Sequence, residues 1–206
     1  MNQGKLYIIS APSGAGKTSL VKKLLSEMQQ LSVSVSHTTR AMREGEQHGK
    51  DYFFISVDEF KKMKTQHDFL EYAQVFDNFY GTSKLSVTEN LNQGIDVILE
   101  IDWQGAQQIR TMMPNCQSIF ILPPSIEVLQ QRLESRGQDS EEVIARRMKD
   151  SVTEMSHHHE FDYLIVNDDF EQALLELKSI ILSHRLQKSR QQTKLNPLLN
   201  ALCDAG

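Results

Sequence analysis

The sequence predicts an α/β fold built on a mostly parallel sheet. Short apolar runs rich in β-branched residues alternate with segments that carry apolar residues at helical spacing. A glycine-rich turn joins the first of these runs to the first helical segment. Strands that alternate with helices are joined by right-handed crossovers, which produce parallel sheets covered by helices.

The composition is that of a globular chain. The 206 residues carry 22 Lys and Arg against 27 Asp and Glu, a formal net charge of −5, which argues against a protein that coats nucleic acid. No apolar run approaches the roughly 18 residues of a membrane span, and we expect neither a membrane partner nor a signal peptide. The two cysteines have no metal or disulfide spacing, so we expect a reducing, cytoplasmic location.

The first predicted unit is a strand, a turn and a helix. Residues 6–9 form an apolar run typical of a buried strand. Gly, Pro and Ser dominate residues 10–16. Apolar residues then recur at helical spacing from Leu20 to Met28, which predicts a helix over residues 17–30.

Residues 31–90 are typical of an insertion with its own small sheet. Apolar residues alternate with serines from Leu31 to Val35, as in a half-buried strand. Candidate strands at 52–55 and 69–75 flank a short helix at 57–66. Residues 77–78 and Gly81 predict turns.

The alternation of strands and helices returns after residue 96. The predicted strands cover residues 97–101, 118–122 and 163–166, and the predicted helices cover 104–113, 126–136, 140–155 and 170–190. We expect the basic segment that follows Glu176 to be a solvated helix with a frayed tail.

Residues 11–18 match the P-loop template G-x-x-x-x-G-K-[ST], with Ala11 in place of the first glycine. Small residues let backbone N–H groups converge on a phosphate, and the following helix adds its positive N-terminus. Lys17 can reach the β- and γ-phosphates, and the Thr18 hydroxyl can ligate Mg²⁺. This motif predicts triphosphate binding without distinguishing a GTPase, an ATPase or a kinase. The candidate ATP-binding residues of this segment are Ser13, Gly14, Ala15, Gly16, Lys17, Thr18 and Ser19.

Acidic residues lie at the end of the predicted strand 97–101. The carboxyl ends of parallel strands meet at one edge of the sheet, so Glu100 and Asp102 are expected beside the phosphate loop. Asp102 can hold Mg²⁺ through water or orient a nucleophile. A solvated strand end is the alternative, and we favour function because a P-loop protein needs an acidic group near Mg²⁺.

Arginines occur in pairs along the chain. Guanidinium groups bind phosphate oxygens in a bidentate manner, as transfer between two nucleotides requires. Glu142 and Arg146 are also spaced for a surface salt bridge, so spacing alone leaves the role of the later pairs open. The pairs are Arg40 and Arg43, Arg132 and Arg136, and Arg146 and Arg147.

Four short motifs follow the phosphate loop in order. They are Ser36-x-Thr38-Thr39-Arg40-x-x-Arg43, Gly49-x-Asp51-Tyr52-x-Phe54, Tyr80-Gly81-Thr82 and Asp102-x-Gln104-Gly105. With the P-loop and Val166-Asn167-Asp168-Asp169, the pattern resembles the guanylate kinase family, the ATP:GMP phosphotransferases, over nearly the whole chain. The resemblance is greatest to the bacterial members.

The resemblance implies a three-layer P-loop core with a mixed α/β insertion and a helical lid. The core would comprise residues 1–34, 91–126 and 158–206, the GMP-binding subdomain residues 35–90, and the lid residues 127–157. It also implies direct in-line transfer of the ATP γ-phosphoryl group to GMP, and to dGMP if the 2′-hydroxyl is not read. Lid closure would exclude water from the site.

Motif positions imply specific roles. A carboxylate at Glu71 can accept the N1–H and N2–H₂ donors of guanine, a pair that adenine lacks. Thr18 would ligate Mg²⁺ directly and Asp102 through water, while Asn167 would lie near the ATP adenine. The implied catalytic residues are Lys17, Arg40, Arg132, Arg136 and Arg147. The implied GMP-binding residues are Ser36, Arg40, Arg43, Tyr52, Glu71, Tyr80, Thr82, Glu100 and Asp102.

Two positions depart from the family pattern. Ala11 stands where the family usually has Gly, and Glu100 stands where many members have Asp. Neither change removes a charged group from the implied mechanism.

Three other activities compete with this interpretation. Scaffold modules of the same fold bind phosphopeptides, but typically lack an intact phosphate loop. A kinase for a phosphorylated ribose would not need Glu71 and Thr82, and a regulatory GTPase would carry an Asn-Lys-x-Asp motif. The sequence leaves the oligomeric state open, a homo-oligomer included.

Two aromatic features are expected to be structural. His157, His158 and His159 point in different directions if helical, so we expect an exposed helix end rather than a metal site. Trp103 is expected in core or loop packing.

Overall fold

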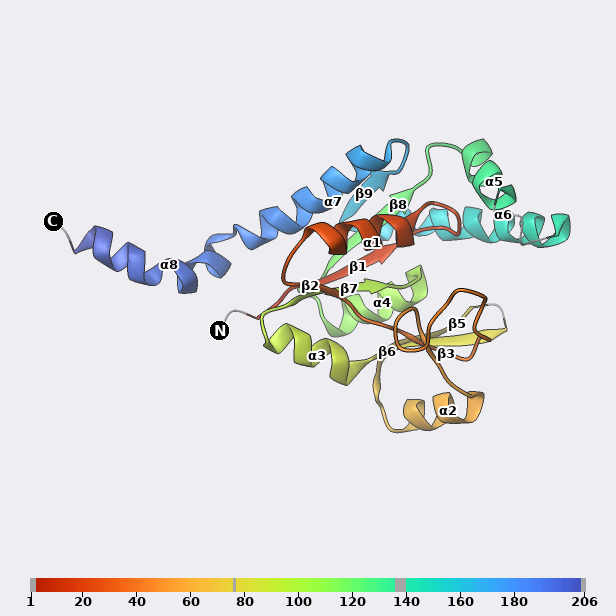
Figure 1. The fold of residues 1–206 in the computed structure, drawn as a ribbon, viewed down its shortest axis with the longest axis horizontal. Helices are drawn as coiled ribbons and strands as arrows, with labels where there is room; N and C mark the ends of the chain where they lie inside the picture. Colours follow the sequence, from red (N-terminus) through yellow and green to blue (C-terminus); the bar gives the residue numbers. More distant parts are fainter. Residues whose placement is uncertain (1–2, 76, 136–139, 205–206) are drawn as a thin grey trace.

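The centre of the molecule is a five-stranded parallel sheet (Figure 1). The computed structural model describes residues 3–75, 77–135 and 140–204, apart from the side chain of Thr193. In spatial order the strands are β2 (Leu31–Val33), β7 (Asp96–Glu100), β1 (Leu6–Ser10), β8 (Gln117–Leu122) and β9 (Tyr163–Val166).

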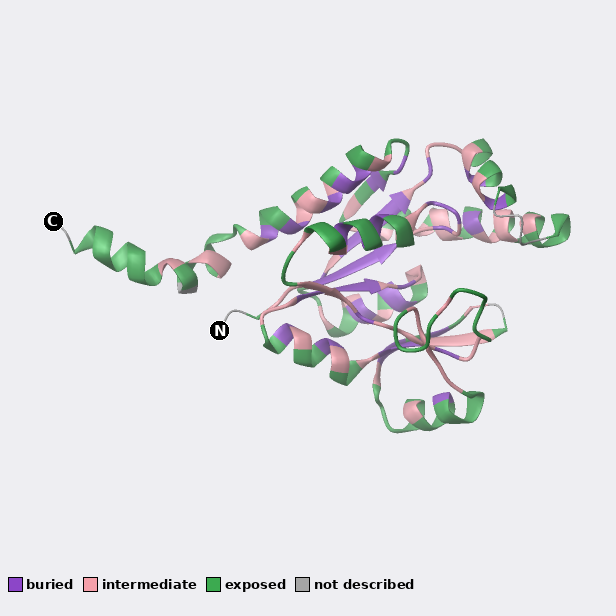
Figure 2. Ribbon diagram, in the orientation of Figure 1, coloured by how far each residue is buried: buried purple, intermediate pink, exposed green. Residues whose placement is uncertain are grey.

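Helices cover both faces of this sheet. Successive side chains of β1 point to opposite faces, so they pack in two separate cores. Tyr7 and Ile9 pack with α1 (Lys17–Glu27) and α7 (Phe170–Arg185) on one face. Leu6 and Ile8 pack with α3 (Lys84–Asn92) and α4 (Trp103–Met112) on the other. Figure 2 shows the buried sheet between these exposed helical surfaces. The predicted three-layer α/β core is confirmed.

A second, mixed sheet lies near the carboxyl edge of the first. Its strands are β4 (Phe53–Phe54), β3 (His37–Thr38), β6 (Asn78–Ser83) and β5 (Phe69–Val75), and α2 (Val57–Thr65) packs on it. The rings of Phe60 and Phe69 lie 4.6 Å apart and form the centre of this packing. Gln108 of α4 donates to the Tyr72 carbonyl oxygen of β5 at 2.9 Å, which joins the small sheet to the core.

Several features of this region differ from the prediction. The strand expected at residues 31–35 is β2, which pairs with β7 of the core sheet and does not belong to the small sheet. Gly81 lies inside β6 and not in a turn, and a Cβ there would lie 2.9 Å from the Phe69 ring. Glycine is therefore needed for close packing rather than for a turn. The short strand β3 and the helix α3 were not predicted, because two residues show no period and α3 has few apolar residues. Val87 and Leu91 of α3 are buried against the core sheet.

The segment expected to form the lid, residues 127–157, contains most of α5 (Ile126–Glu134), α6 (Glu141–Ser156) and the start of the 3₁₀ turn η1 (His157–Glu160); its role as a lid stays a prediction. The sequence predicted one helix over 170–190, but α7 ends at Arg185 and α8 (Lys188–Cys203) follows. Figure 1 shows α8 extending away from the rest of the molecule. Within the described ranges, no helix is long and apolar enough to cross a membrane.

Asp96 anchors the C-terminal helices to the core sheet. Its carboxylate is 1% exposed and accepts hydrogen bonds from the Lys5 backbone N–H, Arg185 Nε and Arg190 Nη2 at 2.7, 2.8 and 2.9 Å.

Replacing Asp96 by alanine is expected to lower the free energy of unfolding by about 2–4 kcal/mol, because two guanidinium groups lose a buried partner. Urea denaturation measures this, and Lys23→Ala, which removes one exposed pair with Glu27, is the control. Equal effects of the two changes would contradict the anchoring role.

Candidate active site

The phosphate loop lies between β1 and α1. Gly14 and Gly16 have φ angles of 95° and 93°, in the left-handed region that favours glycine. Among the described residues, no side chain caps the N-terminus of α1 at Gly16. The backbone of Ala11 does not enter the left-handed region, so the departure at this position imposes no strain on the loop.

Asn167 holds this loop through its side chain. Its side chain is 5% exposed, and Nδ2 donates to the Ala15 carbonyl oxygen at 2.7 Å. A Cβ at Gly16 would lie 2.3 Å from the same nitrogen, so glycine is required for this approach. Arg132 Nη2 donates to the Asn167 carbonyl oxygen at 3.0 Å. The implied contact of Asn167 with adenine stays a prediction.

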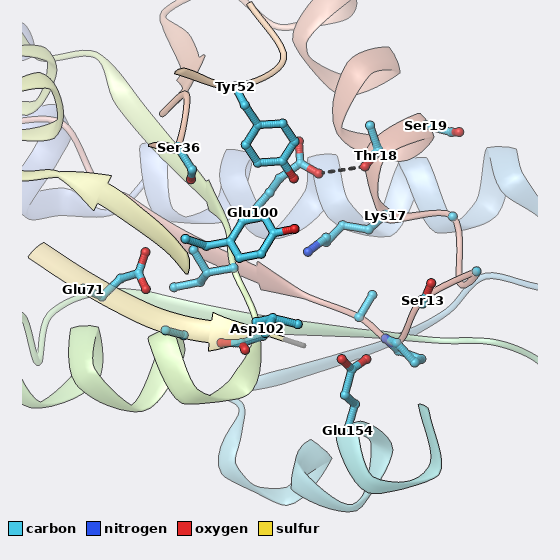
Figure 3. Close-up of a pocket in the computed structure, with 18 residues that line it drawn as sticks. Ser13, Lys17, Thr18, Ser19, Ser36, Tyr52, Glu71, Glu100, Asp102 and Glu154 are labelled. Atoms are coloured by element: carbon cyan, nitrogen blue, oxygen red, sulfur yellow. Dashed lines mark hydrogen bonds between the residues drawn. The ribbon is translucent and has the colours of Figure 1, made fainter. Parts of the chain in front are cut away.

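A cavity of about 310 Å³ opens in front of the loop (Figure 3). Lys17 points into it, and Thr18 Oγ1 donates to Glu100 Oε2 at 3.2 Å. Asp102 caps α4 by accepting the Gly105 N–H through Oδ1 at 2.9 Å. Predicted site residues that line this cavity are Ser13, Gly14, Gly16, Lys17, Thr18, Ser19, Ser36, Tyr52, Glu71, Tyr80, Glu100 and Asp102.

The far end of this cavity carries a buried carboxyl group. Glu71 of β5 is 3% exposed, and its Oε1 accepts from Thr82 Oγ1 of the neighbouring strand at 2.5 Å. Burial raises the pKa of Glu71 to about 7, although the hydrogen bonds from Thr82 act in the opposite direction. A Cβ on Gly105 would lie 2.6 Å from Glu71 Oε2. Glycine in α4 therefore makes room for this carboxyl group, a reason that the motif alone did not reveal.

A second cavity, of about 540 Å³, contains the arginines that lie between β3 and β4 of the small sheet. Arg40 and Arg43 line it. Glu46 accepts from Arg40 Nη2 at 2.7 Å and from the Arg43 backbone N–H at 2.8 Å. The Arg40 guanidinium lies 5.5 Å from the centre of the Tyr52 ring. Burial raises the pKa of the Tyr52 hydroxyl to about 12, so this group is a hydrogen-bond donor at neutral pH.

The two cavities are contiguous, since six residues line both: Lys17, Thr18, Ser36, Tyr52, Tyr80 and Glu100. The cations of the arginine cavity thus face the phosphate loop across one shared wall. An anion in each cavity would bring two negatively charged groups close together, with positive side chains on both sides. This arrangement suits phosphoryl transfer between two bound phosphate esters.

The lid arginines are not assembled in this space. Arg132 contacts the Asn167 backbone, and Arg147 lies partly buried on α6, but neither lines either cavity. Arg136 lies outside the described residues. Their implied roles in catalysis stay predictions.

Sequence reasoning missed two acidic residues of the site. Glu46 pairs with Arg40, and this pairing, opposed by burial, lowers the pKa of its carboxyl group. Glu154 lines the phosphate-loop cavity from α6. It lies seven residues after Arg147, two helical turns along the same face, so helical spacing from that arginine could have identified it.

The expected exposed helix end at the histidines is wrong for His157. Its ring stacks on Trp103 with centroids 3.5 Å apart and planes 6° apart. Nδ1 of His157 lies 2.6 Å from Glu160 Oε1, and Arg110 Nη2 donates to Glu160 Oε2 at 2.6 Å. The packing role of Trp103 is thus to join α4 to the end of the lid. Within the described part of the chain, no cluster of His, Cys, Asp and Glu is arranged to hold a metal ion by itself.

Comparison with known proteins agrees with this geometry. A family model described as guanylate kinase matches residues 3–184. Guanylate kinase of Hahella chejuensis is 59% identical over 202 residues, covering 98% of this chain and 97% of that protein. Guanylate kinase of Escherichia coli K12 is 58% identical over 204 residues, covering 98% and 99%.

A solved structure extends the comparison to the fold. The crystal structure of guanylate kinase from Anaplasma phagocytophilum matches with a TM-score of 0.77 and 35% sequence identity, over 92% of this chain and 90% of that one. The chain belongs to the guanylate kinase family.

Proposed function

We propose that this protein transfers the γ-phosphoryl group of ATP to GMP and releases ADP and GDP. The observation that carries the proposal is the continuity of one cavity from the Lys17 loop to the Glu71–Thr82 pair. The phosphate loop suits a triphosphate, and a carboxylate at the opposite end suits the paired donors of guanine. Family membership supports the same reaction.

The reaction needs no covalent enzyme intermediate. An oxygen of the GMP phosphate attacks the γ-phosphorus in line, and the bond to the β,γ-bridging oxygen breaks, so ADP leaves with the electron pair. Lys17 stabilises charge on the transferring group, while Arg40, Arg43, Tyr52 and Tyr80 hold the acceptor phosphate. Arg40 must exchange its pair with Glu46 for the phosphate when GMP binds.

Mg²⁺ is the metal we propose as cofactor, bound together with ATP. Mg²⁺ takes hard oxygen ligands, usually one or two carboxylates with phosphate oxygens and water. The Thr18 hydroxyl, Glu100 carboxylate and Asp102 carboxylate at the carboxyl edge of the sheet fit that set. We propose Thr18 as the direct ligand and Asp102 as a ligand through water. When bound, the ion supplies neutralisation of phosphate charge.

We propose a cytoplasmic location with small-molecule substrates only; Cys116 is a buried free thiol and Cys203 an exposed one. A homo-oligomer remains compatible with this proposal, and size-exclusion chromatography with light scattering would measure it.

The direct route predicts the stereochemistry of transfer. With ATP made chiral at the γ-phosphorus by sulfur and oxygen isotopes, a single in-line displacement is expected to invert configuration in the product. Retention would indicate a phosphorylated enzyme intermediate and contradict the proposed route.

Gly105 offers a test of the guanine end that leaves the phosphate loop untouched. Gly105→Ala is expected to raise the KM for GMP about tenfold or more, because the new Cβ displaces the Glu71 carboxylate. Alanine is favoured over glycine within a helix by about 1 kcal/mol, so lost helix stability would not explain the effect. Steady-state kinetics with ATP and GMP varied separately measure it; an unchanged GMP KM would contradict this role of Gly105, and the KM for ATP is the control.

A further inference from the structure

Glu154 is the one described residue of α6 that lines the cavity at the phosphate loop. In Figure 3 its carboxylate points from the lid helix toward the loop near Ser13. Its Oε2 is buried and has no hydrogen-bond partner among the described residues. The proposed reaction assigns this carboxylate no role, although it lies where negatively charged phosphates are expected.

The Glu154 carboxyl group lies beside donors that suit an anion. Burial raises the pKa of its carboxyl group to about 7, while the charge of Lys17 and the backbone N–H of Ser13 favour the ionised form. Asp102 and Asp150 oppose ionisation. Lys17 and the loop N–H groups are the donors that a triphosphate would use. A carboxylate and a phosphate cannot share them without strong repulsion in a partly desolvated cavity.

The end of α6 is held next to this carboxylate. His157, one turn after Glu154, stacks on Trp103 and pairs with Glu160, which Arg110 also binds. Ser151, one turn before Glu154, is buried. A rotation of α6 that carries Glu154 away from the loop would therefore also shift His157 against Trp103. Arg147 lies two turns earlier on the same face, so that rotation also moves Arg147.

We propose that Glu154 is a positioning residue that holds the lid helix against the empty phosphate loop and is displaced by the terminal phosphates of ATP. Lid rearrangement is thereby coupled to binding of the triphosphate. This inference rests on the proposed function only in taking ATP as the ligand of the loop.

Equilibrium binding without GMP tests the inference separately from turnover. Glu154→Gln keeps the shape and a hydrogen-bond acceptor but removes the charge. It is expected to tighten binding of Mg²⁺ with a non-hydrolysable ATP analogue about tenfold, and that of ADP less. Glu142→Gln, the same change at an exposed site in the first turn of α6, is the control and is expected to leave both affinities unchanged.

Trp103 is the single tryptophan of the chain and reports the position of the lid through its stack on His157. The ATP analogue is expected to change Trp103 emission in the unsubstituted protein. Without nucleotide, the emission of Glu154→Gln is expected to lie shifted toward that of the nucleotide-bound protein. Glu154→Ala should act in the same direction as Glu154→Gln, and circular dichroism establishes that both variants are folded.

The outcomes separate the two proposals. Weaker or unchanged ATP binding in both folded variants would contradict displacement of Glu154 by ATP. The carboxylate would then either favour nucleotide binding or not contact the nucleotide. Trp103 emission that does not respond to the analogue would contradict the coupling to the lid. Failure of the unsubstituted protein to bind ATP would overturn both proposals, whereas normal ATP binding without GDP formation would overturn only the proposed reaction.

Discussion

Replacement of Lys17 by alanine is expected to reduce kcat by about 10³-fold or more while the protein remains folded. Lys17 is the first residue of α1 and points into the cavity in front of the phosphate loop. Its ammonium group would stabilise charge that develops on the transferring phosphoryl group, and losses of this size follow removal of such a group. ADP formation in a coupled assay measures kcat, and circular dichroism measures folding.

A second lysine of the same helix provides the control. Lys23 lies on the exposed side of α1 and pairs with Glu27 at 2.8 Å. Lys23→Ala removes the same charge and is expected to leave kcat within about twofold, since surface pairs contribute little. GDP formation that survives Lys17→Ala at the normal rate would mean that this loop does not bind the transferred phosphate.

Glu71→Gln is expected to lower the selectivity of the protein for guanine over adenine. A neutral amide can accept one donor of guanine but presents an N–H₂ group to the other, so the KM for GMP should rise about 10- to 100-fold. Discrimination against AMP should fall. In the unsubstituted protein adenine would leave the buried carboxylate unpaired, and the variant has no carboxylate at this position. The ratio of kcat/KM for GMP and AMP measures this. A ratio equal to that of the unsubstituted protein would remove Glu71 from base recognition.

The pH dependence of GMP binding follows from the same group. Burial raises the pKa of Glu71 from 4.5 to about 7, so the folded protein holds this proton more tightly than the unfolded chain. Guanine requires the ionised form, and affinity for GMP is therefore expected to decrease as pH falls below 7. The GMP phosphate also titrates, near pH 6, and this contribution persists in Glu71→Gln. Dissociation constants of both proteins from pH 5.5 to 8.5 separate the two effects; parallel profiles would contradict the assignment to Glu71.

The core of the fold could be predicted because its signals are local. The Leu6–Ser10 strand is buried on both faces, and its residues 6–9 form an apolar run; the glycines of the following loop occupy the left-handed region. Both features are recognisable along the chain without knowledge of distant residues.

The remaining elements depend on distant contacts. Gly81 suggests a turn in isolation, but it lies in β6, where it pairs with His37 and Tyr72 of the neighbouring strands. The helix that begins at Phe170 ends at Arg185. The Arg185 side chain donates a hydrogen bond to Asp96 of the core sheet. Such contacts override local preference, and neither leaves a periodic pattern in the sequence.

The candidate site shows the same division. Residues implied by the P-loop motif or by the family resemblance, such as Lys17 and Glu71, were predicted and line the cavity. Glu46 and Glu154 belong to no motif that we recognised, because their importance arises from the cations that they approach in space. The lid arginines stay predictions, since neither Arg132 nor Arg147 lines the cavities of this structure.

One cavity joins the phosphate loop to Glu71, and we propose that it holds a triphosphate at one end and guanine at the other. The most direct test is ADP formation from Mg²⁺-ATP with GMP, AMP, UMP, CMP and ribose bisphosphate offered in parallel. The structure predicts that kcat/KM for GMP exceeds that for each other acceptor by about 10²-fold or more. Comparable turnover with AMP, or none with any acceptor in folded protein that binds ATP, would contradict the account.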